Sequence, residues 1–298
     1  MISVVIPVYN REHLVKRTLD SVAAQTLAPD KVILVDNNST DGTRAVLDGW
    51  AAGRDNVEVI SCATPGAAAA RNAGLALVES DYVMFFDSDD YMPPRHVEQV
   101  SAALAGENPP PIVAFDMELV DLSGRRTLKA FRRGDPLFNH IFHAILCTLR
   151  FVVSAAFIRN IGGWPCNLKV WDDYELGVRL LYNTSAVRNI SLEHPPVAFA
   201  QAESITGTKF SDKAGEWERA LDACERALAG SRYAGLIDWR RAILAGMYMR
   251  EGHRELAMPL LKNFKMKLIA RYVALGGRGV AELARLSGWR ACARSRRE

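Results

Sequence analysis

Three aspartates stand within four positions, directly after an apolar run. Residues 83–91 read VMFFDSDDY, so Asp87, Asp89 and Asp90 follow four apolar side chains. Like charges this close repel one another, and a carboxylate is costly to bury without a partner. Divalent cations prefer carboxylate oxygens, and Mg²⁺ typically takes one or two of them together with substrate phosphates. The stretch therefore predicts a cation-assisted site; the alternative is an Asp-rich turn or a helix N-cap.

Two further charged residues have types and positions suited to such a site. Asp36 directly follows the apolar run 31–35, and its carboxylate can accept a hydrogen bond from a nucleobase N–H or a ribose hydroxyl. Arg71 stands about one turn into an alanine-rich helical pattern, so it can pair with a diphosphate or with one of the aspartates. A purely structural Arg–Asp pair fits the same residues. The asparagines of the NNSTDG cluster at 37–42 are expected to serve only as turn residues.

A second acidic pair, Asp172 and Asp173, precedes a helical pattern. The surrounding residues 161–181 read IGGWPCNLKVWDDYELGVRLL. One interpretation is a helix N-cap. The other is a general base, because a carboxylate at a helix start beside the cation site can remove a proton from an acceptor hydroxyl. Gly162 and Gly163 would allow the backbone to approach a substrate closely.

Apolar runs alternate with helical patterns along the first ninety residues, which predicts the elements that must position these side chains. Parallel strands joined by helices form an open α/β sheet with helices on both faces. Ligands of such sheets bind outside the carboxyl ends of the strands, where Asp36 and Asp87 both stand. The expected strands are 3–8, 31–36, 57–62 and 82–87, and the expected helices are 12–26, 43–50 and a helix entered from 65.

The remaining chain is predicted to become increasingly helical. The apolar stretch 137–158 is not expected to span a membrane, because Arg150 and two histidines would be costly at the bilayer centre. We expect a strand at 112–120, a hairpin or loop at 121–136, a buried helix and then a strand within 137–158, a helix at 172–183, and helices at 216–229 and 239–250 in an almost wholly helical region after 213.

Charge is distributed unevenly over the 298 residues, although the formal net charge is only +3. Residues 262–298 contain ten Lys or Arg and two acids, a net +8, while the remainder carries −5. This tail predicts an anionic partner, and the apolar residues interleaved between Phe264 and Leu275 favour a membrane surface. No nucleic acid is expected as partner. The alternative is a helix packed on the protein with its basic face in water.

Cysteine usage and the N-terminus bear on the compartment. Five scattered cysteines without C-x-x-C spacing argue against a disulfide framework or a structural zinc, and they fit a reducing compartment. The N-terminal MISVVIPVYN has no basic leader and reads as a strand, so no signal peptide is expected. We therefore expect a cytoplasmic protein, placed at the inner face of the plasma membrane if the tail binds lipid.

Four motifs together resemble the nucleotide-sugar-binding half of the family-2 inverting glycosyltransferases, which have the GT-A fold. They are VVIPVYN, VDNNSTDGT, GAAAARNAG and FFDSDD, in that order, and the later block IGGW…WDDYELGVRL resembles the family's acceptor-side motif. The resemblance spans about residues 1–206 and implies an α/β fold with a Rossmann-like, mostly parallel sheet flanked by helices and a C-terminal helical extension. It implies a nucleotide-sugar-binding half at 1–105, an acceptor-binding and catalytic half at 106–212, and a helical region with the basic tail at 213–298.

The resemblance also implies roles for individual residues. On the donor side, Asp87 matches the ribose-side acid, and Asp89 matches the acid that binds Mg²⁺ or Mn²⁺. On the acceptor side, Asp173 matches the catalytic base. Further matches are Pro7, Tyr9 and Asp36 at the nucleotide base, Arg71 near the base and diphosphate, Asp172 at a neighbouring acid, and Gly162, Gly163 and Trp164 in the acceptor-side loop.

The implied activity is inverting transfer of a sugar from a nucleotide-diphospho-sugar, with UDP the expected nucleotide. The implied acceptor is a hydroxyl of a glycan or lipid-linked sugar in surface polysaccharide synthesis. One alternative is a catalytically inactive binding protein of the same fold. Another is a sugar nucleotidyltransferase, which would need a glycine-rich phosphate loop where this chain has PVYNR at 7–11. The family often carries Arg-x-His before Ser-x-Ser; this chain has Phe199 and Gln201 before 204–206.

Overall fold

Parallel strands dominate the main sheet, as the alternating sequence pattern predicts. The computed structural model describes residues 1–201 and 209–287, and within them seven strands lie in the order β3-β2-β1-β4-β8-β5-β9. The order turns back on itself at β1, so β2 and β4 pair with its two edges in parallel. The strands are β1 (Ile2–Val8), β2 (Lys31–Asp36), β3 (Val57–Ser61), β4 (Tyr82–Phe85), β5 (Ile112–Phe115), β8 (Phe151–Ser154) and β9 (Val187–Ile190).

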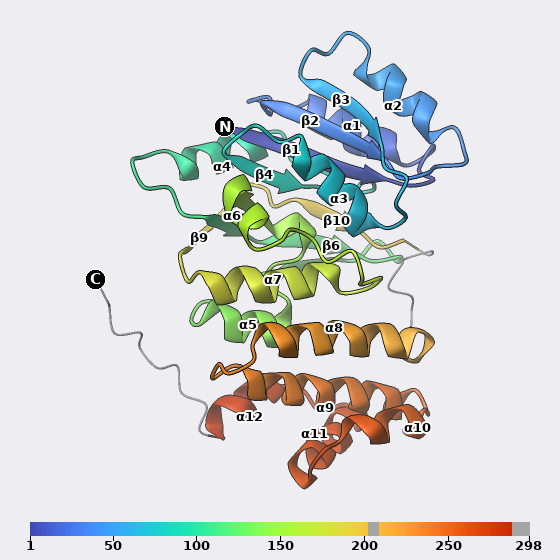
Figure 1. Cartoon of the computed structure of the whole chain (residues 1–298), viewed down its shortest axis with the longest axis vertical. Coiled ribbons are helices and arrows are strands. Elements are labelled where there is room, and N and C mark those ends of the chain that lie inside the picture. Colours follow the sequence, from blue (N-terminus) through green and yellow to red (C-terminus); the bar gives the residue numbers. More distant parts are fainter. Residues whose placement is uncertain (202–208, 288–298) are drawn as a thin grey trace.

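Helices cover both faces of this sheet, which confirms the predicted α/β architecture (Figure 1). One face is packed by α1 (Val15–Ala23), α2 (Thr43–Ala51) and α4 (His96–Leu104). The other is packed by α3 (Ala67–Ala76), α5 (Pro136–His143), α6 (Ala155–Asn160) and α7 (Asp172–Asn183).

Strand β8 runs antiparallel to both of its neighbours, β4 and β5. The sheet is therefore mostly parallel, as expected, with its antiparallel strand at this position. The short run FVVS carries no signal for direction, since an apolar strand reads the same either way. The reversal brings the start of β8, rather than its end, to the edge where β4 finishes.

The single strand expected at 112–120 is two strands in two sheets. Between them lies Asp116, whose carboxylate accepts a hydrogen bond from the Phe131 backbone N–H at 2.7 Å and holds the chain where it leaves the main sheet. Strand β6 (Met117–Val120) then joins a small sheet in the order β10-β6-β7. Its partners are β7 (Arg126–Lys129), within the expected hairpin, and β10 (Val197–Phe199), which the sequence pattern did not reveal.

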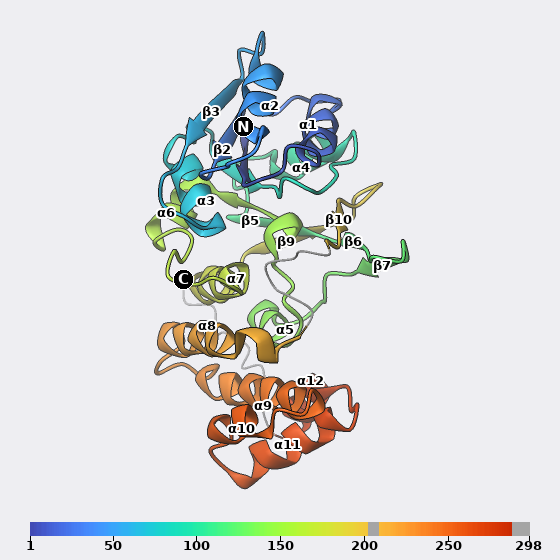
Figure 2. The same ribbon diagram turned by 90° about the vertical axis from the view of Figure 1, so that its right-hand side faces the viewer.

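The C-terminal helices stack beneath α5 and α7 and share their core (Figures 1 and 2). A chain of aromatic rings crosses this junction: Trp171 lies 5.1 Å from Tyr174 of α7 and 4.7 Å from Trp217. The elements are 3-10 turns η1 (Thr148–Arg150), η2 (Ser211–Lys213) and η3 (Met258–Leu260), and helices α8 (Ala214–Ala227), α9 (Ala234–Arg250), α10 (Arg254–Ala257), α11 (Phe264–Ala274) and α12 (Val280–Leu286). No helix in the described part of the chain is long and apolar enough to cross a membrane.

Gly74 sets the close packing of α3 on the sheet. A Cβ at this position would lie 2.4 Å from Val5 Cγ1 and 3.2 Å from Val35 Cγ2. Only glycine therefore lets α3, which carries Arg71, lie this near to β1 and β2.

We predict that Gly74→Ala lowers the free energy of unfolding by about 1–3 kcal/mol, because the added methyl overpacks the helix–sheet contact. Gly49→Ala is the matched control, since Gly49 is exposed in α2 and a Cβ there meets nothing within 4 Å. The control should be neutral or stabilise by up to about 1 kcal/mol. Urea denaturation of both variants measures the difference; equal stability would contradict the packing account.

Candidate functional site

The residues expected at the nucleotide base lie where β1 and β2 end side by side. Asp36 is the last residue of β2 and pairs in register with Val8 of β1. Its carboxylate is buried and accepts from the Ser39 backbone N–H at 3.3 Å. Tyr9 follows β1 and is 54% exposed, whereas Pro7 is buried within the strand. This end of the parallel strands is called the carboxyl edge below.

Asn37 does more than form a turn. Its Nδ2 donates to the carbonyls of Cys62 (2.9 Å) and Thr64 (2.7 Å), and its Oδ1 accepts from the Gly66 N–H at 2.8 Å. The side chain thereby fastens the loop after β3 to the end of β2 and fixes the start of α3. Only a turn role was expected for Asn37, because these partners lie 25–29 positions away along the chain.

Arg71 stands at the centre of the acidic side chains. Its Nη2 lies 2.7 Å from Asp87 Oδ1, and its Nη1 lies 2.8 Å from Asp172 Oδ2. The guanidinium also lies over the Trp164 ring, 4.3 Å from its centroid. Burial lowers the pKa of Arg71, but the charges of Asp87 and Asp172 more than offset this and raise it. Arg71 thus connects α3, the end of β4 and the start of α7.

Asp89 and Asp90 differ in their surroundings. Asp89 has an ion pair with Arg11 Nε at 3.8 Å. Burial and the charge of Asp87 raise its pKa, against the opposing charge of Arg11. Asp90 instead accepts from the Phe199 backbone N–H at 3.1 Å, so it holds β10 and does not cap the turn that follows it.

The acidic pair occupies the first turn of α7. The N-cap position itself is taken by Trp171, in a left-handed conformation with φ 55° and without a side-chain cap, so neither aspartate is the N-cap. Asp173 Oδ1 accepts from the Tyr174 N–H at 2.7 Å. Burial, and then the charge of Asp172, raise the pKa of Asp173 to about 7, while Arg71 opposes the shift. A carboxylate titrating near neutrality is suited to proton abstraction.

The glycines before Trp164 permit a close contact with α3. Gly163 has φ 67°, and a Cβ there would lie 2.6 Å from Asn72 Oδ1. Asn72 donates to the Trp164 carbonyl and accepts from the Trp164 N–H, both at 2.9 Å. Arg179 of α7 donates to the Gly163 carbonyl at 2.7 Å. The loop is therefore held by hydrogen bonds from both α3 and α7. Gly162, with φ 91°, has a positive φ like Gly163.

The segment before β8 adds residues that the sequence did not identify. Burial, and then the charge of Asp173, raise the pKa of the Cys147 thiol to about 12; the charges of Asp87 and Asp90 add to the shift. Arg150 is buried, and its Nη2 has no hydrogen-bond partner among the described residues. No local motif marks either residue, since the reversal of β8 brings Cys147 near the acids, while Arg150 donates to the Phe115 carbonyl at 3.4 Å.

The positions at which the family often carries Arg-x-His hold no histidine in this chain. Phe199 packs under the Arg17 guanidinium at 3.8 Å, and Gln201 donates to the Phe199 carbonyl at 3.3 Å. His194 is exposed and lies 4.0 Å from Glu193. Residues 204–206 lie outside the described residues.

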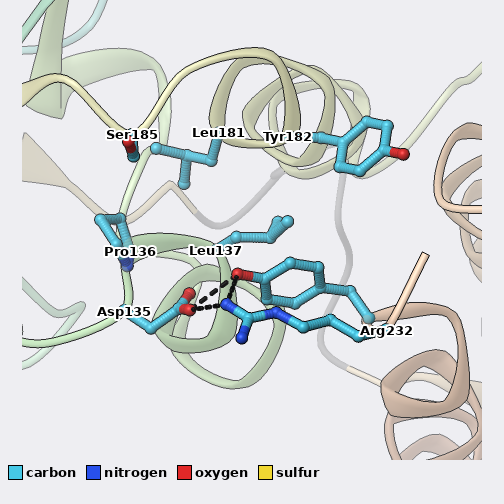
Figure 3. Close-up of a pocket in the computed structure, with 8 residues that line it drawn as sticks. Asp135, Pro136, Leu137, Leu181, Tyr182, Ser185 and Arg232 are labelled. Atoms are coloured by element: carbon cyan, nitrogen blue, oxygen red, sulfur yellow. Dashed lines mark hydrogen bonds and ion pairs between the residues drawn. The ribbon is translucent and has the colours of Figure 1, made fainter. Parts of the chain in front are cut away.

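Two pockets lie outside this group of acids. Figure 3 shows the first, where the Asp135 carboxylate accepts from Tyr233 Oη at 2.7 Å and pairs with Arg232 at 3.0 Å. It is formed by the start of α5, the end of α7 and the α8–α9 connection. The second pocket borders Tyr91, directly after Asp90, and also includes Pro93, Glu118, Arg126, His194 and Phe199.

The donor atoms around Asp89 fit a divalent cation that is shared with a substrate. Its carboxylate oxygens are the ligand type that Mg²⁺ and Mn²⁺ prefer, and burial together with the charge of Asp87 raises the pKa of this carboxyl. Among residues 1–201 and 209–287, no three His, Cys, Asp or Glu side chains converge to hold a metal alone. A cation here would take its remaining ligands from phosphate oxygens and water.

Comparison with known proteins shows the family of the chain. The sequence model of the family described as Glycosyl transferase family 2 matches residues 3–152. A poly(ribitol-phosphate) beta-glucosyltransferase of Bacillus spizizenii is 39% identical over 95 residues, which are 30% of this chain and 15% of that protein.

Solved glycosyltransferases of the GT-A type share the fold. S. aureus TarS in complex with UDP-GlcNAc superposes with a TM-score of 0.67 at 18% identity, covering 92% of this chain and 79% of that one. The mannosyltransferase PcManGT from Pyrobaculum calidifontis, in complex with GDP-Man and Mn²⁺, gives a TM-score of 0.57 at 15% identity, covering 96% and 79%. With half of its length matched by the family's sequence model, the chain belongs to glycosyl transferase family 2.

Proposed function

We propose that the protein transfers a sugar from a UDP-linked donor to a hydroxyl of a glycan or lipid-linked acceptor, with inversion at the anomeric carbon. The observation that carries this is the double ion pair of Arg71. It holds Asp87, the first acid of the Asp-x-Asp, and Asp172, next to Asp173, on a single guanidinium. The guanidinium of Arg71 thereby bridges an acid proposed for the donor side and an acid proposed for the acceptor side.

On the donor side, the nucleotide would lie along the carboxyl edge. Tyr9 and Asp36 would contact the base beside Pro7, and Asp87 would accept from a ribose hydroxyl. Asp89 would hold a divalent cation, Mg²⁺ or Mn²⁺, that supplies Lewis-acid stabilisation of the leaving diphosphate. Arg71 would fix the acids in place and add positive charge near the diphosphate.

On the acceptor side, the carboxylate of Asp173 would accept the proton of the acceptor hydroxyl. The hydroxyl oxygen forms its bond to the anomeric carbon as the bond from that carbon to the diphosphate oxygen breaks, and the nucleoside diphosphate leaves with the electron pair. Attack comes from the opposite face, so the configuration inverts. The acceptor side would be shaped by Asp172 together with the loop residues Gly162, Gly163 and Trp164.

One finding supports a role in surface polysaccharide synthesis, and a second supports a UDP-linked donor. The Bacillus spizizenii relative acts, by its name, on poly(ribitol-phosphate). The fold neighbour TarS was crystallised with UDP-GlcNAc. A lipid-linked acceptor would place the reaction at the inner face of the plasma membrane.

We predict that Asp89→Asn lowers the rate of metal-dependent sugar transfer about 100-fold or more, since one cation ligand is lost. The measurement is turnover of UDP-sugars across a Mn²⁺ titration, with Mn²⁺-dependent UDP binding followed by thermal shift. Asp55→Asn, on the exposed surface before β3, is the control and should leave both unchanged. Full activity in Asp89→Asn would contradict the metal assignment; UDP binding without any turnover in the unmodified protein would identify an inactive binding protein.

We predict that the transfer rate rises with pH through about 7 and is level above, because Asp173 must be ionised to accept a proton. Asp173→Asn should lower the rate by roughly 10²–10⁴-fold and abolish this rise in any residual activity. A pH–rate profile between pH 5.5 and 9 measures both. A profile in the parent protein without a step near 7 would argue against Asp173 as the base.

A stability measurement tests the same pKa independently of turnover. The folded pKa of Asp173 is raised from 3.8 to about 7, so its contribution to folding becomes unfavourable as pH rises through this window. Asp173→Asn should therefore raise Tm by a few degrees at pH 8 relative to the parent and by clearly less at pH 5, where the penalty has only partly developed. Equal shifts at both pH values would contradict the raised pKa.

A further inference from the structure

Helix α11 lies at the end of the molecule far from β1, β2 and β3 (Figures 1 and 2). One side of it packs against the rest of the protein, through Met266, Ile269 and Val273, all of which are buried. The contact with α9 is close: a Cβ at Gly246 would lie 2.6 Å from Val273 Cβ. The orientation of α11 is therefore fixed, and so is the side that it turns outward.

The outward side of α11 is apolar. Phe264 is 74% exposed, Leu268 51%, Tyr272 43% and Leu275 89%. At 100° per residue, these positions lie within a sector of about 80°, opposite the buried side. This set of four residues is called the outer stripe below. A surface helix normally turns polar side chains outward, so four large apolar residues on one exposed sector need a partner.

Basic residues flank the outer stripe on both sides. In the helical projection, Lys267 and Arg271 lie along one border and Lys265 along the other, and α11 contains no acidic residue. Lys267 and Arg271 are exposed and have no ion pair within the described residues. In contrast, Lys262 is neutralised by Asp238 at 3.1 Å. The free cations therefore border the apolar sector.

An apolar sector with cations along its borders is the pattern of a helix that lies in the interface of an anionic membrane. Helix α12, which packs on α9 and α5, also carries exposed leucines, with Leu283 41% exposed and Leu286 83% exposed. A second copy of this chain is a poorer fit, because a face-to-face pair would bring Lys267 and Arg271 of both copies together. Charge complementarity thus favours acidic lipid headgroups.

We infer that the outer stripe of α11 docks the protein on an anionic lipid surface, with Phe264, Leu268 and Leu275 entering the acyl boundary and Lys267 and Arg271 contacting headgroups. Within the basic region 262–298, membrane contact is thereby assigned to one face, the outer stripe. It does not depend on the proposed transfer chemistry, since the stripe is remote from the carboxyl edge and binding requires no donor.

The test is flotation of the full chain with vesicles of phosphatidylcholine containing 30% phosphatidylglycerol, compared with pure phosphatidylcholine, in the absence of donor. We expect binding only to the anionic vesicles, weakening as salt is raised. Phe264→Ser/Leu275→Ser should weaken binding at least about tenfold, since two exposed apolar side chains are lost. Lys267→Gln/Arg271→Gln should weaken it roughly tenfold to thirtyfold.

Matched controls use exposed residues elsewhere. Leu122→Ser/Leu128→Ser removes two exposed leucines near and in β7, and Lys16→Gln/Lys129→Gln removes two exposed lysines. Both should bind as the parent does, and all variants should keep the parent Tm and Mn²⁺-dependent UDP binding.

Three outcomes would overturn the inference. The first is absence of binding to the anionic vesicles. The second is equal binding by the stripe variants and the controls. The third is a concentration-dependent dimer, seen by light scattering, that the stripe variants dissociate, because that would assign the face to a second copy. If the first outcome came with a fall in Tm confined to the stripe variants, the outer stripe would be assigned to a contact with another part of the chain.

Discussion

A single buried guanidinium holds the two halves of the candidate site together. Arg71 is ion-paired with an aspartate that follows β4, 16 positions away along the chain, and with one that opens α7, 101 positions away. Removing one partner of such a buried pair leaves an uncompensated charge, so the two acids and the arginine depend on one another. Several other contacts serve to keep this group in place: Gly74 brings α3 onto the sheet, Asn37 fixes the start of α3, and Asn72 ties the same helix to the Trp164 loop.

Features set by local pattern could be predicted from the sequence. The positions of Asp36 and Asp87 at strand ends follow from apolar runs that stop abruptly, and α7 has the bounds its spacing predicts. The direction of β8 could not be predicted, because a short apolar strand buried on both faces has no polarity in its residues. The break at Asp116 was missed for a related reason: the apolar pattern continues across it, and only a distant N–H marks the corner.

The electrostatics of the site could not be predicted from the sequence either. The residues around Asp173 identify an acidic pair, but its raised pKa comes from burial by tertiary packing. The same holds for Asn72 and Arg179, which are ordinary helix residues until the 161–164 loop is placed between them. Local motifs therefore identified candidate chemistry, while packing decided which side chains support it.

Strand β8 has a further consequence. Every parallel strand delivers to the carboxyl edge the loop that leaves it, but β8 delivers the loop that enters it, with Cys147 and Arg150. The wall near Asp173 is thus built from a segment that belongs to none of the loops that follow the parallel strands. If the nucleotide lies along the carboxyl edge, as proposed, substitutions in that segment would reshape the space beside the acids while the strand ends on the donor side stay as they are. Donor and acceptor preference would then be able to diverge separately within one fold.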